Sequence, residues 1–311
     1  MRYLVTGGGG FIGANIVERL IESGHEVRVL DNFATGRREN LASLLGRFDL
    51  IEGDIRDYWT VEEAVRGVDY VLHQAALPSV PRSVKNPLTS NEVNINGTLN
   101  VLAAARQAKV KKVVLASSSS VYGDANVSKK NESLPLSPLS PYAVTKAAGE
   151  QYGRLFWELY GVPTVSLRYF NVFGPRQNPE GDYAAVIPKF IRAVLTHQVP
   201  VVYGDGGQSR DFTYIENVVR ANLLAVTNPE IIGISLNAAC GTTFSLNHLL
   251  KEVCRIVGTS VEAEYGDPRP GDVRHSCADI SLFRKFGYEP AVSFGEGLRR
   301  TIEYFRVQLD K

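Results

Sequence analysis

A glycine-rich loop near the N-terminus constrains the fold of this chain more than any other feature. Its spacing is GxxGxxG, with glycines at Gly7, Gly10 and Gly13, between an apolar segment and a helical pattern. The loop must turn tightly, let its backbone approach a pyrophosphate and pack a helix against a strand, and each demand favours a residue without Cβ. The N-terminus of the helix then offers unpaired N–H groups to the anion. The loop therefore predicts a dinucleotide-binding unit of strand, turn and helix.

An acidic residue at the end of the second predicted strand indicates which dinucleotide is bound. Asp31 stands where a carboxylate can accept hydrogen bonds from the adenosine ribose hydroxyls, and it would repel a 2′-phosphate. Arg37 and Arg38 follow closely and keep NADP open as an alternative. The pattern as a whole favours NAD.

The first half of the chain alternates between two kinds of segment. Short, apolar, β-rich stretches lie at 3–6, 26–30, 50–52, 70–73, 113–116 and 164–167. Helical patterns lie between most of them, at 13–23, 60–65, 91–108 and 142–160. This alternation predicts an α/β fold with a Rossmann-type, doubly wound parallel sheet and helices on both faces. The nearly continuous apolar character of the strands favours burial on both sides.

The second half is less regular and predicts a smaller α/β C-terminal cap that binds substrate over the carboxyl ends of the strands. Glycine and proline punctuate it, and helical patterns lie at 187–196, 215–226 and 246–257. We predict a discontinuous division of the chain. Residues 1–170 plus about 212–240 form the NAD-binding domain, and about 171–211 plus 241–311 form the substrate-binding domain.

The composition indicates an ordinary globular protein. Hydrophobic residues make up 44% of the 311 residues and the net charge is +1. We expect no nucleic-acid partner, no membrane partner and a cytoplasmic location. Cys240, Cys254 and Cys277 lack CxxC spacing, so we interpret them as buried small hydrophobic residues and expect no metal site.

Tyr142 and Lys146 form the candidate chemical centre. They stand at i and i+4 in a helical pattern and so share one face. A tyrosine with its ordinary pKa of ~10 is a poor base at neutral pH, and a nearby ammonium lowers that pKa. A serine run at 117–120 follows a predicted strand, at the edge where open α/β sheets bind ligands. A hydroxyl there can hold a substrate hydroxyl beside Tyr142, whereas Tyr122 is interpreted as a packing aromatic.

Together these motifs resemble the extended short-chain dehydrogenase/reductase family. The resemblance rests on the glycine loop, the serine run ending in Tyr122-Gly123, the YxxxK motif of Tyr142 and Lys146, and the RYFNVFG segment that begins at Arg168. The motifs keep the family's order over essentially the whole chain. Within the family, the UDP-glucose and UDP-N-acetylglucosamine 4-epimerases are most similar, through the stretches 79–83, 183–189 and 209–212.

The resemblance implies transient oxidation of a UDP-sugar at C4 by bound NAD. Tyr142 would take the proton of the 4-hydroxyl, Lys146 would keep Tyr142 anionic and bind the nicotinamide ribose, and Ser118 would align the hydroxyl. The 4-keto sugar would then turn and accept hydride on its other face. Related dehydratases and decarboxylases resemble versions of the serine run that carry a carboxylate, and Ser118, Ser119 and Ser120 supply none. Because a hydroxyl cannot readily replace a carboxylate as a proton acceptor, the run favours 4-epimerisation.

Further contacts are implied by the same resemblance. For the cofactor they are Gly7, Gly10, Phe11, Ile12, Gly13, Asp31, Asn32, Asp54, Ile55, Ala75, Asn94, Tyr142, Lys146 and Tyr169. For the UDP-sugar they are Ser118, Ser119, Tyr142, Asn171, Val186, Tyr203, Arg210, Arg269, Asp272 and Ser276. The two arginines suit a diphosphate through their bidentate geometry. A homodimer that pairs the helices at 91–108 and 142–160 is implied as well.

Ser276 bears on the choice of sugar. Some 4-epimerases restricted to UDP-glucose and UDP-galactose have a tyrosine at this place in the family, and a serine leaves room for an N-acetyl group at C2. We therefore predict that UDP-GlcNAc and UDP-GalNAc are accepted alongside the plain hexoses. Two alternatives stay open. One is a UDP-glucuronic acid 4-epimerase, although those enzymes tend to have threonine in place of Asn171, and the other is a catalytically silent NAD-binding regulatory protein.

Overall fold

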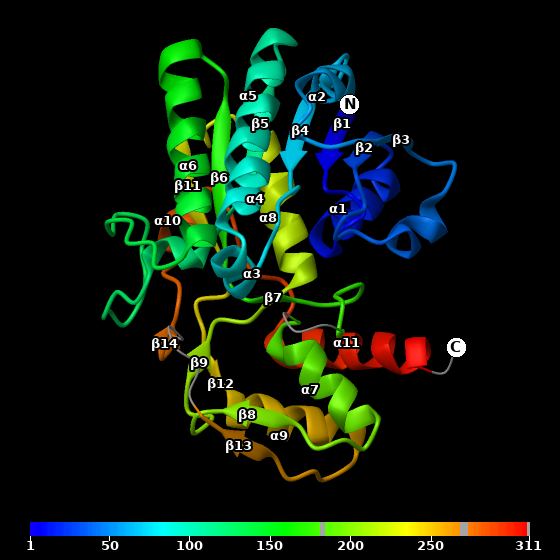
Figure 1. Ribbon diagram of the computed structural model, residues 1–311, viewed down its shortest axis with the longest axis vertical. Coiled ribbons are helices and arrows are strands. Elements are labelled where there is room, and N and C mark those ends of the chain that lie inside the picture. The colour runs from blue at the N-terminus through cyan, green and yellow to red at the C-terminus, as the bar shows by residue number, and fades with distance from the viewer. Residues whose placement is uncertain (181–183, 268–272, 310–311) are drawn as a thin grey trace.

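A seven-stranded parallel sheet forms the centre of the computed structural model, which describes residues 1–180, 184–267 and 273–309. The strand order is β11-β6-β5-β4-β1-β2-β3, and all pairings are parallel (Figure 1). The strands are β1 (Arg2–Thr6), β2 (Glu26–Asp31), β3 (Asp49–Glu52), β4 (Tyr70–His73), β5 (Lys112–Ser118), β6 (Thr164–Tyr169) and β11 (Ile234–Ala238). The order reverses between β1 and β4, the switch point at which such sheets bind ligands. The predicted doubly wound fold is confirmed.

Helices cover both faces of this sheet. One face carries α2 (Tyr58–Val65), α5 (Gly97–Gln107) and α6 (Pro141–Tyr160), and the other carries α1 (Phe11–Glu22) and α8 (Ile215–Thr227) (Figure 1). The central strands are buried on both sides, as predicted. The edge strand β3 differs, because three of its four residues are exposed.

The segment predicted as one helix at 91–108 is divided. It begins inside α4 (Pro87–Asn91), continues as a π-helical turn (Glu92–Asn96) and ends with α5. At this turn the side-chain amide of Asn94 accepts a hydrogen bond from the N–H of Leu77 and donates to the carbonyl of Leu77 and to the hydroxyl of Thr145. Periodicity does not reveal such a bulge, which recurs at functional sites. The other short helical pieces of the first half are Arg38–Leu44, α3 (Val80–Lys85) and Ser119–Tyr122.

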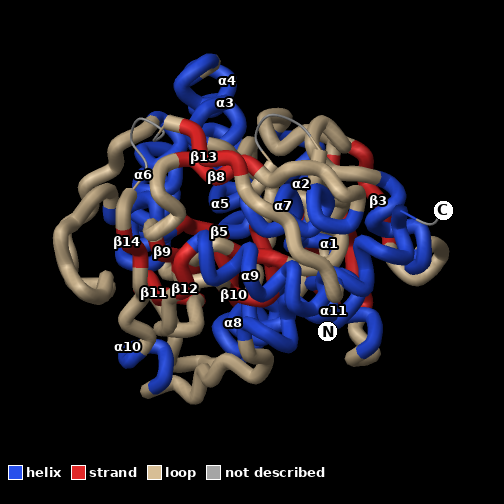
Figure 2. The backbone as a smooth tube through the Cα atoms, turned by 90° about the horizontal axis from the view of Figure 1, so that it is seen from below, coloured by secondary structure: helices blue, strands red, loops and turns tan. Residues whose placement is uncertain are grey.

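The smaller part of the molecule is built from short strands and three longer helices. Strand pairs are β7 (Val172–Phe173) with β10 (Thr213–Tyr214) and β8 (Val201–Tyr203) with β13 (Glu264–Gly266), and β9 (Ser209–Arg210) lies between β12 (Phe244–Ser245) and β14 (His275–Ser276). The helices are α7 (Val186–Leu195), α9 (Leu246–Val257) and α11 (Phe294–Leu309). These helices lie below the large sheet in Figure 1 and in front of it in Figure 2. The short α10 (Ser281–Arg284) packs instead against β11 of the large sheet.

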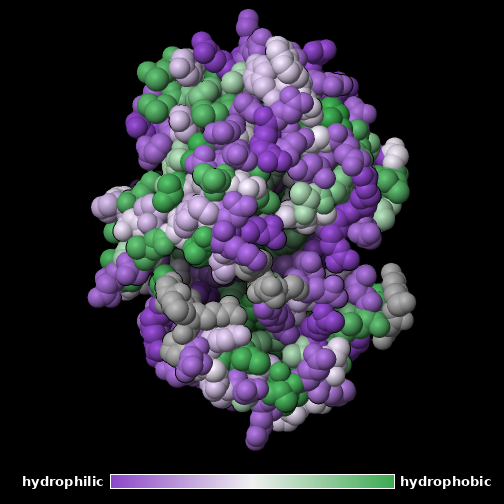
Figure 3. All heavy atoms as spheres, in the orientation of Figure 1, coloured by the Kyte–Doolittle hydropathy of each residue, from purple (hydrophilic) through white to green (hydrophobic). Residues whose placement is uncertain are grey.

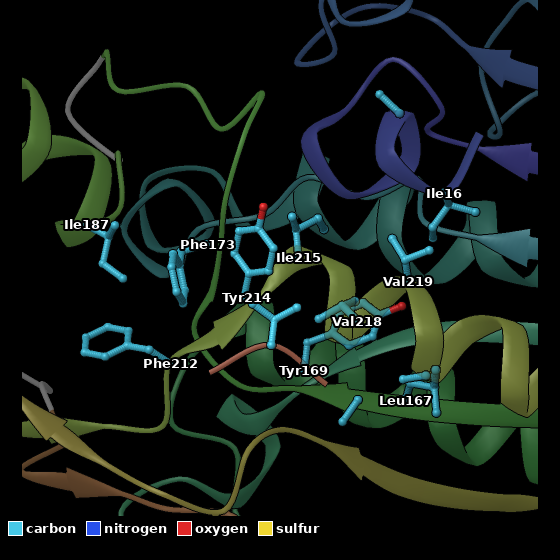
Figure 4. Close-up of a cluster of buried hydrophobic side chains, with 14 of the residues drawn as sticks. Ile16, Leu167, Tyr169, Phe173, Ile187, Phe212, Tyr214, Ile215, Val218 and Val219 are labelled. Atoms are coloured by element: carbon cyan, nitrogen blue, oxygen red, sulfur yellow. The ribbon is translucent and has the colours of Figure 1, made fainter. Parts of the chain in front are cut away.

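One hydrophobic core runs through both parts (Figure 4). Leu167 and Tyr169 of β6 and Val218 and Val219 of α8 meet the aromatic group of the smaller part, where the ring centroids of Phe173 and Tyr214 are 5.6 Å apart. Burial of this kind contributes roughly 25 cal/mol per Å² of apolar surface, so the two parts stabilise one another. The domain boundaries stay a prediction.

Hydrophilic and hydrophobic side chains are interspersed over the face of the molecule seen in Figure 3, and a hollow crosses it between the upper and lower parts. Within the described ranges, none of the helices combines the length and apolar character that a membrane span requires. Cys240, Cys254 and Cys277, which were expected to be buried, are partly buried free thiols, and Cys254 packs against the main hydrophobic core.

Candidate active site

The glycine loop has the geometry that its sequence predicts. Gly7 has a φ of +69°, and a Cβ on it would lie 2.7 Å from the backbone of Ala75. A Cβ on Gly13 would lie 2.1 Å from the carbonyl oxygen of Gly7. Gly10 is the N-cap of α1 and has no side chain to satisfy the first N–H groups of the helix. The loop thus leaves backbone donors at a helix N-terminus beside a surface that side chains cannot fill.

Asp31 is fixed at the end of β2 by the same loop. Its buried carboxylate accepts hydrogen bonds from the N–H of Gly9 at 2.8 Å and of Phe33 at 2.7 Å. Burial raises the pKa of Asp31, and the two backbone donors act in the opposite direction. The guanidinium of Arg38 is paired with Glu52 at 2.5 Å and lies over the Phe33 ring. A negative charge therefore stands where the 2′-phosphate of NADP would have to approach.

A cleft of about 700 Å³ runs from the glycine loop to Tyr142 and Lys146. The predicted cofactor residues that line it are Gly7, Gly10, Phe11, Ile12, Gly13, Asp31, Asn32, Asp54, Ile55, Ala75, Tyr142, Lys146 and Tyr169. Asn94 is not among the lining residues. It is buried behind the wall, where its amide holds Leu77, which does line the cleft.

Tyr142 and Lys146 line this cleft, and Ser118 lies beside Tyr142. The α6 helix begins there because Pro141 occupies its first turn and Ser140 caps it by accepting from the N–H of Ala143. The hydroxyl of Ser118 is hydrogen-bonded to Tyr142 and also accepts from the hydroxyl of Ser120 at 2.9 Å. The predicted catalytic residues are thus brought together at the carboxyl end of β5.

The ammonium of Lys146 is held by the backbone of β5. It donates to the carbonyl of Ala116 at 2.8 Å and lies 5.8 Å from the centre of the Tyr142 ring. Burial lowers the pKa of Lys146 to about 8, while the carboxylate of Glu150 acts to raise it. Burial raises the pKa of Tyr142 to about 12, opposed by the Ser118 hydrogen bond. The expectation of a net lowering of the Tyr142 pKa is therefore wrong for the protein alone, since desolvation dominates.

The predicted substrate residues lie on the smaller part and at its junction with the sheet. Val186 begins α7, Tyr203 ends β8, and Asn171 follows β6 with a φ of +35°. Arg210 and Ser276 are partners in the parallel pairing of β9 with β14, and Ser276 is buried. Arg269 and Asp272 lie outside the described residues, and Ser119 begins the helical turn after β5.

Comparison with known proteins agrees with this geometry. The model of the NAD dependent epimerase/dehydratase family matches residues 3–239. A putative UDP-glucose 4-epimerase of Methanocaldococcus jannaschii is 39% identical, over 97% of this chain and 98% of its own length. The solved UDP-N-acetylglucosamine 4-epimerase of Methanobrevibacter ruminantium, in complex with UDP-N-acetylmuramic acid, is 42% identical with a TM-score of 0.95, over 99% of this chain and 98% of that one.

The chain belongs to the NAD dependent epimerase/dehydratase family. It is an epimerase-family enzyme of the extended short-chain dehydrogenase/reductase type, and its cofactor is NAD. The UDP-glucose 4-epimerase of Thermus thermophilus, solved with NAD, is 40% identical with a TM-score of 0.91, over 98% of this chain and 99% of that one.

The family includes several reactions on nucleotide sugars. A UDP-glucuronic acid 4-epimerase from Bacillus cereus matches at 33% identity, a dTDP-glucose 4,6-dehydratase from Streptomyces venezuelae at 32%, and a decarboxylase from Bacillus cytotoxicus at 34%. Each match spans 98% or more of this chain and of the relative. Family membership alone therefore does not determine which of these reactions the chain catalyses; that depends on the side chains of its site.

The same cleft also contains residues that the motifs did not indicate. Arg176 and Gln177, after β7, line it, and Arg176 is joined to Glu18 of α1 by an ion pair of 2.6 Å. Gln74 after β4 and Asn222 of α8 hydrogen-bond the hydroxyl of Tyr169. These contacts join segments far apart in the sequence, so no local pattern carries them.

His73 closes β4 and is a structural residue. Its two ring nitrogens are hydrogen-bonded to the hydroxyls of Thr6 at 2.7 Å and Thr98 at 3.0 Å. Complete burial, with a smaller effect of Lys146, lowers its pKa to about 3. An imidazole that stays neutral and has both ring nitrogens hydrogen-bonded does not act as a proton acceptor at physiological pH.

Proposed function

We propose that this protein is a UDP-sugar 4-epimerase that oxidises its substrate transiently at C4. The observation that carries the proposal is the hydroxyl-only run of Ser118, Ser119 and Ser120 beside Tyr142 and Lys146. Elimination of water across C5 and C6 needs an acid and a base at the sugar. The nearby carboxylates do not supply them: Glu150 is paired with Arg168, and Glu132 accepts from the N–H of Asn237.

Each residue of the site has one task in this reaction. Bound NAD supplies reversible hydride transfer. Tyr142 accepts the proton of the sugar 4-hydroxyl and returns it, Ser118 orients that hydroxyl, and Lys146 places a positive charge beside Tyr142 that favours its anionic form. Burial holds the pKa of Tyr142 at about 12 in the protein alone although Lys146 is already in place, so the base becomes active only once cofactor and substrate have assembled the site.

Arg210 is proposed as the anchor of the substrate diphosphate, together with Arg269, and Asp272 as the ligand of the uridine ribose. Because the sugar must rotate between the two hydride transfers, the protein has to hold the substrate by its nucleotide part. The guanidinium of Arg210 is oriented by the carbonyls of Ser209 and Arg274, at 2.9 and 3.2 Å. Asn171, Val186 and Tyr203 are proposed to complete the substrate pocket, and Asn94 to support the cofactor.

The reaction is tested by incubating the purified protein separately with UDP-glucose, UDP-GlcNAc and UDP-glucuronate and resolving the C4 epimers by chromatography. We expect epimers from at least one of the first two substrates. Turnover of UDP-glucuronate alone would favour the second 4-epimerase candidate. A 4,6-dehydrated or decarboxylated product would overturn the assignment, and bound NAD without any turnover would indicate the regulatory protein.

We propose that the pocket accepts an N-acetyl group at C2 because Ser276 is small. A Ser276→Tyr variant is expected to lose activity on UDP-GlcNAc at least about tenfold more than activity on UDP-glucose, because the larger side chain removes space on one side of the sugar. Steady-state kinetics on both substrates measure this, with Ser276→Ala as the size-neutral control. Equal losses on the two substrates would contradict the pocket assignment. Melting temperatures separate this from general overpacking, since Ser276 is buried.

A homodimer across α5 and α6 is proposed from the exposed apolar side chains of the second helix. Val144, Trp157, Leu159 and Tyr160 are exposed on α6. The last three lie in the final turn of the helix, and a group of exposed large apolar side chains is typical of a covered surface. Sedimentation velocity is expected to give twice the mass of one chain, and Leu159→Glu is expected to shift it to that of a monomer. A wild-type protein that sediments as a monomer at micromolar concentration would refute the proposal.

A further inference from the structure

A buried ion pair lies one helical turn beyond Lys146. Glu150 of α6 and Arg168 of β6 are joined by two hydrogen bonds of 2.6 and 2.9 Å, and their side chains are 3% and 5% exposed. Burying two charges costs more free energy than such a pair usually returns. A purely stabilising role is therefore a poor explanation for it.

The carboxylate of Glu150 does more than neutralise Arg168. One of its oxygens also accepts a hydrogen bond from the hydroxyl of Ser117 in β5, and the other accepts from the hydroxyl of Ser235 in β11 at 3.1 Å. Arg168 in turn donates to the hydroxyl of Tyr122 at 2.8 Å. A single carboxylate thus connects α6 with three adjacent strands of the sheet.

The contact to Ser117 is one of three contacts between the end of β5 and α6. Three consecutive residues of β5 are each bonded to one of three α6 residues that stand one turn apart. Ser118 is bonded to Tyr142, the carbonyl of Ala116 accepts from Lys146, and the hydroxyl of Ser117 donates to Glu150. Two of these contacts belong to the proposed catalytic groups. The third contact, at Ser117 between the other two residues of β5, fixes how far β5 can slide or tilt beneath them.

We propose that Glu150 is a positioning residue that, through Ser117, holds the end of β5 in the place where Ser118 and Ala116 can engage Tyr142 and Lys146. This inference rests on the proposed function of Tyr142 and Lys146. Displacement of reacting groups by about 1 Å costs on the order of a hundredfold in rate, so such a contact controls turnover without touching the substrate.

The charge of Glu150 acts on Lys146 as well. The titratable groups that face Lys146 are Tyr142 and Glu150 on its own helix and His73 from β4, and Arg168 from β6 lies behind Glu150. His73 is neutral, so Glu150 is the negative group that favours the ammonium form. Removing its charge lowers the pKa of Lys146. Activity that needs a protonated Lys146 is then lost at a lower pH as the solution is made more alkaline.

Three variants of the full-length, NAD-loaded protein test the proposal. Glu150→Gln removes the charge, Ser117→Ala removes the contact to β5 but keeps the ion pair, and Glu158→Gln is the control. Glu158 lies on the same helix and forms an exposed pair with Arg154. The measurements are kcat, KM, the pH dependence of kcat, the melting temperature, and amide hydrogen exchange of the peptide that contains Ser117.

Glu150→Gln is expected to lower kcat about tenfold to a hundredfold with KM changed by less than about threefold. It should also move the alkaline limb of the pH profile down by about half a unit or more. Ser117→Ala is expected to lower kcat about threefold to tenfold without moving that limb. Both should speed exchange at the end of β5, and Glu158→Gln should match the wild type.

Wild-type kcat and exchange in folded Glu150→Gln and Ser117→Ala would overturn the proposal, as would losses confined to KM. If Glu150→Gln does not fold, because an unpaired Arg168 is left buried, Ser117→Ala decides on kcat and exchange. If the wild type turns over no UDP-sugar, the proposed function fails. Hydrogen exchange then still decides whether Glu150 and Ser117 position β5.

Discussion

Replacing Tyr142 by phenylalanine is expected to lower kcat for 4-epimerisation about 10²- to 10⁴-fold, the range that one positioned acid–base group contributes. Phenylalanine keeps the ring, its burial and its place beside Lys146, and removes only the hydroxyl that is bonded to Ser118. The variant can neither accept nor return the proton of the sugar hydroxyl. Single-turnover measurement of epimer formation, with the enzyme in saturating excess over UDP-sugar, gives the chemical step without product release.

Tyr152→Phe is the matched control for this experiment. Tyr152 lies on the same helix and is partly buried against a cluster of apolar side chains that includes Leu102 of α5 and Phe156 of α6. Its variant should keep wild-type kcat within about twofold, since no transition-state interaction is removed. Tyr142→Phe should still retain NAD, measured as nucleotide released on denaturation. A Tyr142→Phe protein with more than about a tenth of wild-type kcat would show that another group moves the proton.

The parts of this fold that sequence predicts well are those in which one segment carries all the constraint. The glycine loop and Asp31 are of this kind. Turn, helix start and acid follow one another within a single βαβ unit, and each residue type has a steric or electrostatic reason. The structure places them as predicted, with Asp31 bonded to the loop through Gly9. The i and i+4 spacing of Tyr142 and Lys146 works in the same way, because a helix fixes their common face.

The elements that sequence analysis did not find depend on distant partners. Strand β11 contains Asn237, a polar residue that is fully buried because its amide bonds Lys130 and Asp279, far away in the chain. Helix α11 carries Gly295 and Gly297, which weaken a helical pattern. Gly297 is required there, since a Cβ would lie 2.7 Å from the ring of Tyr214. Neither reason is visible within the segment itself.

The pKa values of the site also depend on burial, which cannot be inferred from the local sequence. The spacing of Tyr142 and Lys146 correctly brings an ammonium near the phenol, but it carries no information on burial. Burial raises the pKa of Tyr142 and lowers that of Lys146, against the expected effect of the pair. Glu150, which opposes the change at Lys146, is found one turn further along the same face once the helix is known. A carboxylate four residues after Lys146 was the feature of the sequence that could have indicated this interaction.

Gly13→Ala is the second change with a large expected effect, because it fills space that the cofactor loop itself occupies. The new Cβ would lie 2.1 Å from the carbonyl oxygen of Gly7 and 2.8 Å from the Cα of Gly8, distances that require the backbone to move. Hydrogen bonds of the Gly7 backbone restrict such a movement of the loop. The N–H of Gly7 is bonded to the carbonyl of Leu30 at 2.8 Å, and its carbonyl accepts from the N–H of Gly10 at 3.0 Å. The strain therefore displaces the N–H groups at the start of α1 that are proposed to receive the pyrophosphate.

We expect Gly13→Ala to weaken NAD binding at least about a hundredfold, equivalent to about 2.7 kcal/mol, and to lower the melting temperature of the apoprotein. Calorimetric titration with NAD gives the affinity, and the gain in melting temperature on adding NAD should nearly vanish, since ligand stabilisation scales with affinity. Gly295→Ala is the control. Its Cβ would meet nothing within 4 Å at the start of α11, so NAD affinity should be unchanged. Wild-type affinity in Gly13→Ala would mean that the loop adapts without moving its N–H groups, and that the steric argument for this glycine does not extend to the cofactor.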